Sequence, residues 1–227
     1  MFTYIKARTV GEGIESSLKA LQENGIIQQR ENQNRSEEMK EIQLCLDVEE
    51  PLSEPAISKS MPCSLEQLWQ YDKEFLDGTS DDLGWKYTYH QLYSRFYNDV
   101  INEIGRNPQT RRACIALGQG DINFTSDPPC LQLLIVNVVN NKLELTCVFR
   151  SNDGVKAFPM NIHAISMLQE KLAKDTGYEV GPLHYIATNF HCYRNDFQTL
   201  DNYIKIFDTK PPKRRFYSLE ELSKFAK

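Results

Sequence analysis

The segment Asp127-Pro128-Pro129-Cys130-Leu131-Gln132 joins a rigid corner to a long apolar run, residues 131–139. Proline fixes φ and has no N–H to donate, so Pro128 and Pro129 are not expected inside a paired central strand. Cys130 therefore stands at the mouth of a strand, where a nucleophile is both held and accessible. The simpler alternative is that Cys130 is a small apolar residue that caps a buried strand.

Strands and helices interleave along the rest of the chain, and we expect an α+β fold with a mixed, largely antiparallel sheet. Two strands, 131–139 and 143–149, are separated by Asn140-Asn141-Lys142, a connection typical of a β-hairpin. Alternating apolar residues predict a strand over 41–48, whereas the polar stretch 28–40 has no period and is expected to be a loop. The other predicted strands are 113–117 and 183–193, the predicted helices are 11–24, 64–76, 89–104, 159–173, 196–206 and 218–226, and 51–62 is predicted to be a connection.

The composition is that of an ordinary globular protein, with 227 residues, 41% hydrophobic and 25% charged. We expect one domain over 1–227, with an N-terminal helix and strand in 1–62 and a C-terminal tail over 207–227. The net charge of −5 gives no general footprint for nucleic acid. The six cysteines form no CxxC pair, which favours reduced thiols without a metal or disulfides. Since no apolar run has the length of a signal peptide or a membrane span, we expect a cytoplasmic protein without a membrane partner.

Two patches of polar residues lie at the ends of predicted strands and carry arginine. Arg111-Arg112 precedes a strand, and it is either a solvated loop end or a phosphate clamp, because guanidinium groups match phosphate oxygens. The segment 150–154 follows the second hairpin strand and is either a polar turn or an anion site. In the second case Arg150 and Ser151 hold the anion, and Asp153 accepts a hydrogen bond from a ligand N–H.

Two further patches carry uncharged hydrogen-bonding groups. Asn161 lies at the start of a predicted helix, and its amide both donates and accepts, as pairing with the edge of uracil requires. The alternative is an ordinary polar residue in a first helical turn. His191 and Tyr193 lie two residues apart on one face of a strand, where they either hold a sugar hydroxyl or are simply polar residues at a strand end.

In this order the motifs resemble those of thymidylate synthase and its close relatives, the nucleotide hydroxymethylases. The matching motifs are Asn-Pro-Gln-Thr-Arg-Arg (107–112), Asp-Pro-Pro-Cys (127–130), Phe-Arg-Ser-Asn-Asp (149–153), Phe-Pro-Met-Asn (158–161) and His-Cys-Tyr-Arg-Asn (191–195). Before residue 107 the similarity is weaker and consists of 34–36, 76–79 and 87–89. The short chain is most similar to the archaeal-type branch of the family.

The resemblance implies a thymidylate synthase-like fold that dimerises through its sheet, and a reaction that begins at Cys130. In the family the matching thiolate adds to carbon 6 of a pyrimidine nucleotide. Carbon 5 then takes a one-carbon unit from 5,10-methylenetetrahydrofolate without a metal. Arg150 matches the cation near the thiolate, and Tyr89 matches the tyrosine near the proton that leaves carbon 5.

The resemblance also implies binding roles for the other motif residues. Asn161 matches the asparagine that reads uracil, and His191 and Tyr193 match the pair that binds the sugar hydroxyl. Asp153 and Trp85 are the candidates for the residues that contact the folate. The nucleotide phosphate would be bound by Arg35, Arg150 and Ser151. In a homodimer, Arg111 and Arg112 of the neighbouring subunit would bind it as well.

Some positions depart from the family pattern. The position of the catalytic glutamate falls on Tyr71, so Glu74, one helical turn later, is the candidate acid, with Glu66 as the weaker one. Asn189 replaces an expected aspartate, and residues 218–227 do not resemble the short apolar closing tail. The methyl and hydroxymethyl products therefore both stay open, as does the choice among dUMP, dCMP and CMP. A non-catalytic nucleotide-binding relative is the third hypothesis.

Overall fold

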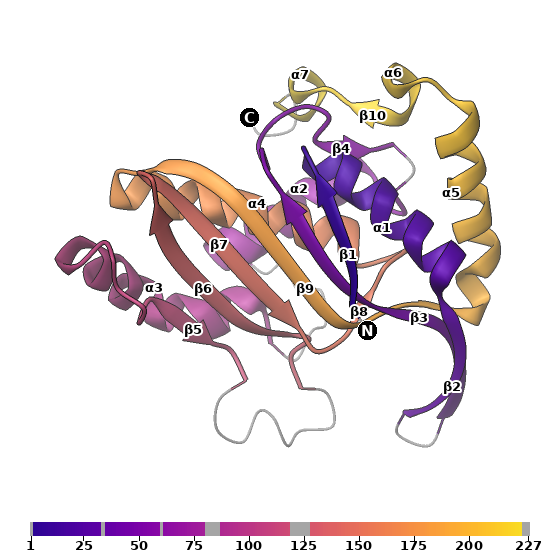
Figure 1. The fold of residues 1–227 in the computed structure, drawn as a ribbon, viewed down its shortest axis with the longest axis horizontal. Helices are drawn as coiled ribbons and strands as arrows, with labels where there is room; N and C mark the ends of the chain where they lie inside the picture. Colours follow the sequence, from indigo (N-terminus) through magenta and orange to yellow (C-terminus); the bar gives the residue numbers. More distant parts are fainter. Residues whose placement is uncertain (1, 33–34, 60, 80–86, 119–127, 224–227) are drawn as a thin grey trace.

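A sheet of eight strands forms the centre of the computed structural model (Figure 1). The structure describes residues 2–32, 35–59, 61–79, 87–118 and 128–223, without side-chain detail at 31, 32, 35 and 36. The strands of the sheet are β1 Phe2–Ala7, β2 Ile26–Asn32, β3 Arg35–Val48, β5 Cys114–Ala116, β6 Leu131–Val139, β7 Lys142–Phe149, β8 Asn152–Asp153 and β9 Glu179–Tyr193. Their order is β1-β3-β9-β7-β6-β5, with β2 beside β3 and β8 beside β9.

The helices follow the predicted pattern closely. They are α1 Val10–Asn24, α2 Leu65–Asp77, α3 Tyr89–Arg106, α4 Phe158–Thr176, α5 Phe197–Thr209, α6 Pro212–Arg215 and α7 Leu219–Ser223, with a short 3₁₀ turn at Arg194–Asp196. Two further short strands, β4 Ile57–Ser58 and β10 Phe216–Tyr217, pair with each other in the predicted connection and tail. The predicted α+β fold with a mixed sheet is confirmed, because β1–β3 and β7–β9 are parallel while β3–β9 and β6–β7 are antiparallel.

The hairpin β6–β7 is confirmed, with Val139 paired to Lys142 across its turn. Asn140 and Asn141 have φ of 51° and 64°, a left-handed conformation that asparagine tolerates better than most residues. This turn sets the register as far as Leu133 and Val148, and a β-bulge between Leu131 and Leu133 then pairs Leu131 with Phe149, so that the start of β6 lies beside the end of β7.

The prediction of a loop over 28–40 is wrong, and β1 was not predicted. The residues 26–32 and 35–41 pair as two antiparallel strands, which we call the β2–β3 ribbon. Ile26 and Ile27 are both 57% exposed, and the ribbon extends away from the helices (Figure 1). Because residues 26–30 are exposed and only Met39 and Glu41 are buried among the ribbon side chains that the structure describes, its sequence lacks the apolar alternation that reveals a strand.

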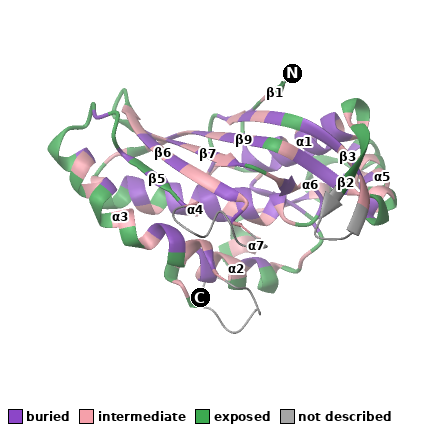
Figure 2. Cartoon of the chain, turned by 90° about the horizontal axis from the view of Figure 1, so that it is seen from below, coloured by how far each residue is buried: buried purple, intermediate pink, exposed green. Residues whose placement is uncertain are grey.

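The helices leave one face of the sheet largely open. Figure 2 shows α2, α3 and α4 on one side of the central strands. Side chains that point to that side, such as Leu145 and Leu183, are fully buried. Alternate side chains on the other face, such as Ile135, Thr146 and Ile186, are only half-buried. Within the described ranges, no helix is both long and apolar enough to cross a membrane.

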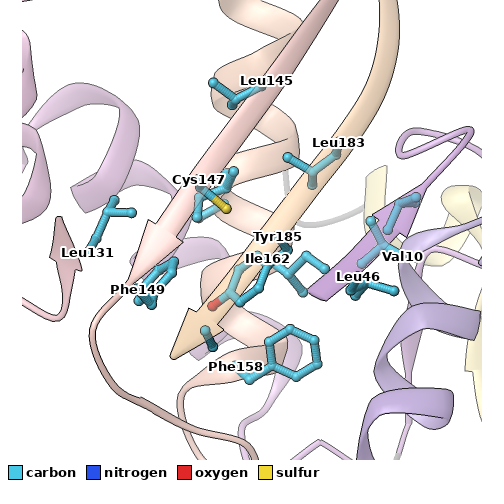
Figure 3. Close-up of a cluster of buried hydrophobic side chains, with 14 of the residues drawn as sticks. Val10, Leu46, Leu131, Leu145, Cys147, Phe149, Phe158, Ile162, Leu183 and Tyr185 are labelled. Atoms are coloured by element: carbon cyan, nitrogen blue, oxygen red, sulfur yellow. The ribbon is translucent and has the colours of Figure 1, made fainter. Parts of the chain in front are cut away.

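A series of aromatic rings runs through the core beneath the sheet (Figure 3). Phe149 stacks on Tyr185 with ring centroids 4.9 Å apart, and Phe158 meets Tyr185 edge-on at 5.1 Å. At the other end, Tyr89 meets the edge of Phe149 at 6.4 Å. Aromatic pairs of this geometry add about 0.5–1.5 kcal/mol beyond their buried area, so the core holds Tyr89 in a defined position.

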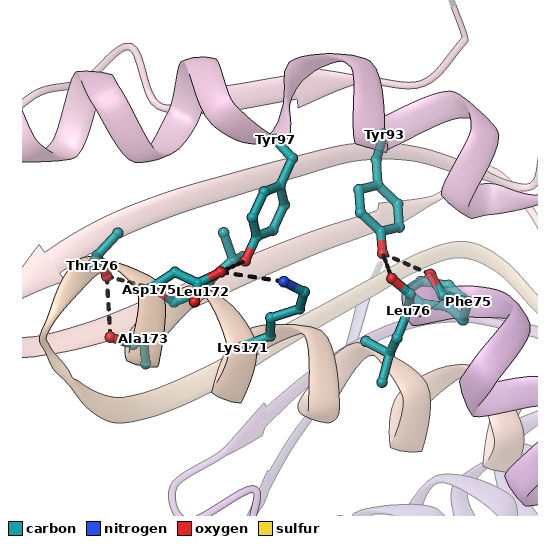
Figure 4. A network of polar contacts seen from close by, with 9 residues as sticks. All are labelled: Phe75, Leu76, Tyr93, Tyr97, Lys171, Leu172, Ala173, Asp175 and Thr176. Carbon is teal, nitrogen blue, oxygen red and sulfur yellow. Dashed lines mark hydrogen bonds and ion pairs between the residues drawn. The ribbon is translucent and has the colours of Figure 1, made fainter. Parts of the chain in front are cut away.

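Polar contacts join α2, α3 and α4 into one layer (Figure 4). The Tyr97 hydroxyl donates to Asp175 at 2.8 Å, and Lys171 donates to the same carboxylate oxygen at 3.2 Å. The Tyr93 hydroxyl donates to the carbonyl of Phe75 at 2.6 Å. These contacts set the position of α2, whose inner face points toward the start of β6.

Candidate active site

Cys130 and Arg150 meet at the end of the hairpin. The N–H of Arg150 donates to the carbonyl of Cys130 at 2.9 Å. Its guanidinium donates from Nε to Pro129 O at 3.1 Å and from Nη2 to Pro128 O at 2.6 Å. The corner therefore holds a cation next to the half-buried Cys130, and a nearby cation stabilises the thiolate form of a cysteine.

Tyr71, Tyr89 and Tyr193 lie near Cys130. Thr88 and Gln91 form a capping box that starts α3 at Tyr89, and the Tyr89 hydroxyl accepts from the N–H of Leu131 at 3.4 Å. Burial raises the pKa of Tyr89, and the nearby Cys130 adds to this shift. Burial likewise raises the pKa of Tyr71 and Tyr193, again with a contribution from Cys130. All three phenols therefore remain protonated and available as hydrogen-bond donors at neutral pH.

Asn161 and Glu74 face this site from two helices. Asn161 lies in the first turn of α4, is 5% exposed, and its side-chain oxygen accepts from the hydroxyl of Tyr71. Glu74 is 6% exposed, and its Oε2 has no hydrogen-bond partner among the described residues. Burial raises the pKa of Glu74, and its charge in turn raises that of Tyr71. Glu74 lies one helical turn after Tyr71. A buried acid therefore lies near the tyrosine that binds Asn161, the residue predicted to recognise the base.

His191 and Tyr193 lie together at the end of β9, with their rings edge-on and 4.8 Å apart. His191 is 4% exposed, and its Nε2 has no hydrogen-bond partner within the described chain. Burial lowers the pKa of His191, although the nearby Asp153 acts in the opposite direction. Asp153 lies in register with His191, and its Oδ1 accepts from the N–H groups of Val155 and Lys156 at 2.9 and 3.0 Å.

Arg111 and Arg112 do not reach this site within one chain. Both are exposed and precede β5, and the carbonyl of Ala113 accepts from the N–H of Val136 at 2.8 Å. Val136 lies six residues along β6 from Cys130, which corresponds to roughly 20 Å at about 3.3 Å per residue. Arg112 instead lines a surface groove of about 210 Å³ together with Phe96, Asp99, Val100, Glu103 and Cys114.

The remaining predicted site residues are placed only in part. Ser151 is half-buried directly after Arg150. Trp85 lies outside the described residues, and Arg35 is described only through its backbone at the start of β3. The weaker acid candidate, Glu66, is exposed in the first turn of α2.

The structure also adds residues that the sequence did not identify as functional. Tyr71 was noted only as the position where an acid was expected, yet its hydroxyl orients Asn161. Glu41 is a charged residue at the start of the predicted strand 41–48, yet it is 7% exposed and is paired with His191 on β9. Helix packing and strand pairing bring these groups to the site, and no local pattern in the sequence signals either contact.

The arrangement combines an accessible thiol, a cation, protonated phenols, a buried acid and an amide at one edge of the sheet. Such a set can add a nucleophile to an electron-poor ring and move protons at the neighbouring atoms. Over the ranges that the structure describes, no three side chains of His, Cys, Asp or Glu are grouped as ligands for a metal.

Comparison with known proteins supports this interpretation. The sequence model of the family "Thymidylate synthase" matches residues 65–225. Proteins of Methanosarcina barkeri and Methanocaldococcus jannaschii, each named "Putative thymidylate synthase", are 24% and 26% identical to this chain. Both alignments cover 88% of this chain, and they cover 94% and 95% of the respective relatives. A thymidylate synthase of Mycoplasma mobile is 33% identical over 116 residues, which is 51% of this chain and 40% of that protein.

A solved structure shows the same fold. Thermostable thymidylate synthase A from Bacillus subtilis superposes with a TM-score of 0.67 at 16% identity, covering 87% of this chain and 84% of that one. The family model spans most of the chain and includes the predicted catalytic motifs from Asp127 onward. The resemblance inferred from those motifs is thus confirmed, and the chain belongs to the thymidylate synthase family.

Proposed function

We propose that this protein transfers a one-carbon unit to carbon 5 of a pyrimidine nucleoside monophosphate, and that the favoured reaction converts dUMP to dTMP. The observation that carries the proposal is the grouping of Arg150, Tyr71, Tyr89 and Tyr193 near Cys130, with Tyr71 linking this group to Asn161 and Glu74. A structural cysteine that merely caps a strand does not require these partners.

The chain's own residues account for the covalent steps. The Cys130 thiolate, stabilised by Arg150, forms a carbon–sulfur bond at carbon 6 while the electron pair of the ring double bond moves toward carbon 5 and the carbonyl at carbon 4. Glu74 supplies a proton to that carbonyl side, and Tyr89 stands near the proton that later leaves carbon 5. Elimination of the thiolate then restores the ring double bond.

Asn161 and the strand β9 select and hold the nucleotide. Because Tyr71 donates to Asn161 Oδ1, the amide of Asn161 has a defined orientation, in which its N–H groups can donate to a ring carbonyl of the nucleotide. His191 Nε2 and the hydroxyl of Tyr193 bind the sugar hydroxyl, which gives the buried Nε2 a partner. Arg150, Ser151 and Arg35 bind the phosphate.

The cofactor of the proposed reaction is 5,10-methylenetetrahydrofolate. It supplies the one-carbon unit and, for a methyl product, the hydride. Asp153 fits such a ligand because its half-buried carboxylate lies beside His191, and a carboxylate accepts hydrogen bonds from the N–H groups of a pterin. Trp85 is proposed to pack against the same ligand.

Product identification tests the proposal. Incubation with dUMP and 5,10-methylenetetrahydrofolate is expected to yield dTMP together with dihydrofolate, followed by the absorbance of dihydrofolate and by mass analysis. Parallel incubations with dCMP and CMP define the base and sugar preference. Intact binding of all three nucleotides without carbon transfer to any of them would contradict the proposal.

A hydroxymethyl product is the second candidate, and two observations favour it. Tyr71 occupies the position where the family has its acid, and it is the partner of Asn161. The C-terminal α7 is held away as a helix by the bond of Leu219 N–H to Glu54 at 2.6 Å and the pair Lys59–Glu221 at 3.0 Å. If water is less well excluded, it traps the exocyclic methylene, and the product is one oxygen heavier than the methyl product.

We further propose that the protein works as a homodimer in which the open face of the sheet is covered by a second copy. This arrangement explains why Arg111 and Arg112 lie roughly 20 Å from the thiol of their own chain, since they would complete the site of the partner. It also removes the half-buried side chains Ile135, Thr146 and Ile186 from water.

Mixing two inactive variants tests the shared site. Cys130→Ala lacks the thiol, and a chain with Arg111→Ala and Arg112→Ala lacks the phosphate clamp. Equal mixing with subunit exchange is expected to restore about a quarter of wild-type activity, because half of the dimers are mixed and each has one complete site. If the mixture stays inactive while size-exclusion chromatography shows mixed dimers, each site is built from a single chain.

A further inference from the structure

Glu41 is a buried carboxylate that the proposed reaction does not use. It lies on β3, is 7% exposed, and is in register with His191 on β9. Arg30 on β2 binds it with two donors, Nε to Oε2 at 3.0 Å and Nη2 to Oε1. Asn189 on β9 donates from Nδ2 to Oε2 at 2.6 Å. One carboxylate therefore joins three strands.

A β-bulge in β9 places Asn189 in this network. Ile42 pairs with Phe190 and Leu44 pairs with Ala187, so that Thr188 and Asn189 together oppose the single residue between them on β3. Such a bulge turns side chains in directions that a regular strand does not allow. Asn189 turns toward Glu41, while the hydroxyl of Thr188 donates to the carbonyl of Arg150 at 2.8 Å.

The network adjoins two parts of the proposed nucleotide site. The β2–β3 ribbon carries Arg35, a proposed phosphate ligand, and Arg30 is the side chain that ties the ribbon's β2 to Glu41. The carboxylates of Asp153, Glu41 and Glu37 each act to raise the pKa of His191, the proposed sugar ligand. The charge of Glu41 is retained because burial, which by itself raises its pKa, is outweighed by the bonds from Arg30 and Asn189.

We propose that Glu41 is a positioning residue, whose carboxylate locks the β2–β3 ribbon to the bulge of β9 and holds His191 and Arg35 in place for the nucleotide. The inference rests on the proposed function for its ligand, and it concerns a residue to which the family motifs assign no role. Isolated surface ion pairs contribute little, but a buried carboxylate with three charge-assisted or amide donors is a rigid joint.

Glu41→Gln keeps the shape of the side chain and removes its charge. In this variant the amides of 26–32 are expected to exchange with deuterium at least about tenfold faster, because hydrogen bonds to charged groups are about twice as strong as neutral ones. The Michaelis constant for dUMP is expected to rise about tenfold, with kcat within about twofold of wild type. The pKa of His191, followed by NMR of its imidazole, is expected to fall, because a carboxylate that favours the imidazolium is lost.

Two further variants keep the test specific. Glu38→Gln removes the neighbouring ion pair to Arg194 on the same strand, and it is expected to change neither the Michaelis constant nor the His191 pKa. Adding Asn189→Asp to Glu41→Gln returns a carboxylate to the joint and is expected to raise the His191 pKa again. If Glu41→Gln does not fold, Arg30→Gln provides the same hydrogen-exchange and Michaelis-constant measurements from the exposed side of the joint.

The outcomes separate this inference from the proposed function. Wild-type protein that neither binds nor converts dUMP, dCMP or CMP overturns the proposed function, while hydrogen exchange and the His191 pKa still decide the role of Glu41. Unchanged exchange of the ribbon and an unchanged His191 pKa in Glu41→Gln would overturn the inference, whatever the nucleotide activity.

Discussion

Replacement of Cys130 by alanine is expected to lower turnover of dUMP by at least about 10⁴-fold, because the reaction has no covalent route without the thiolate. Binding of dUMP is expected to stay within about threefold of wild type, since the arginine, asparagine and histidine partners remain. Dehalogenation of 5-bromo-dUMP needs the Cys130 adduct and an added thiol, which removes the bromine from carbon 5 and is oxidised to a disulfide, but it needs no folate. It should therefore be lost in the same variant, and it provides a measurement that does not depend on carbon transfer.

Cys63→Ala is the matched control, because Cys63 is also a half-buried free cysteine but lies before α2. Burial raises the pKa of Cys63 to about 11, so this thiol is almost entirely protonated at neutral pH and is not expected to act as a nucleophile. Intact dUMP binding without dehalogenation in either the wild type or Cys130→Ala would leave only a nucleotide-binding role for the protein.

Glu74→Gln is expected to lower kcat by about 10²–10³-fold, the range typical for loss of a positioned general acid. The physical basis is burial, because Glu74 is 6% exposed and its Oε2 lacks a protein partner among the described residues. Burial raises the pKa of Glu74, so the carboxyl retains its proton to higher pH than a surface glutamate. Activity that needs the protonated form is expected to fall as pH rises through this pKa, and that limb of the pH–rate profile should disappear in Glu74→Gln.

Two variants on the same helix serve as controls. Glu66→Gln changes an exposed carboxyl in the first turn of α2 and is expected to leave kcat and its pH profile unchanged. Tyr71→Phe removes the donor to Asn161 and is expected to weaken selection of the base more than the chemical step. If Tyr71→Phe loses kcat while Glu74→Gln remains fully active, the catalytic acid is the phenol of Tyr71 rather than the carboxyl of Glu74.

The approach of Cys130 to Arg150 was predictable only in part. A short asparagine turn between two apolar runs sets the register of the hairpin as far as Leu133 and Val148, which brings the start of β6 close to the end of β7. A β-bulge between Leu131 and Leu133, which no local pattern signals, then shifts the pairing by one residue and brings Cys130 next to Arg150. The helix starts at Leu65 and Tyr89 were also predictable in kind, since Ser64 and Thr88 cap them. Local chemistry determines the hairpin turn and the two helix caps, so a single sequence is sufficient to predict them.

The contacts across the site were not predictable in this way. The bond of Tyr71 to Asn161 depends on how α2 packs against α4, and the burial of Glu41 depends on a bulge in β9 and on a ribbon that has no apolar period. The distance of Arg111 from Cys130 follows from the pairing of β5 with β6. Each of these depends on the assembled sheet rather than on neighbouring residues, which is why local patterns do not reveal them.

The edge of the sheet beside β3 is divided between two strands. β1 pairs with 43–48 in parallel, and β2 pairs with 35–41 in the opposite direction, so the two strands lie end to end along the same side of β3. Loss of β1 would uncover six consecutive residues of a central strand, with their backbone donors and acceptors available to another chain. Proteolytic removal of β1 by cleavage near Ala7 would thus turn a paired edge of β3 into an exposed edge that can pair with another chain and promote aggregation. None of the proposed catalytic groups lies in β1.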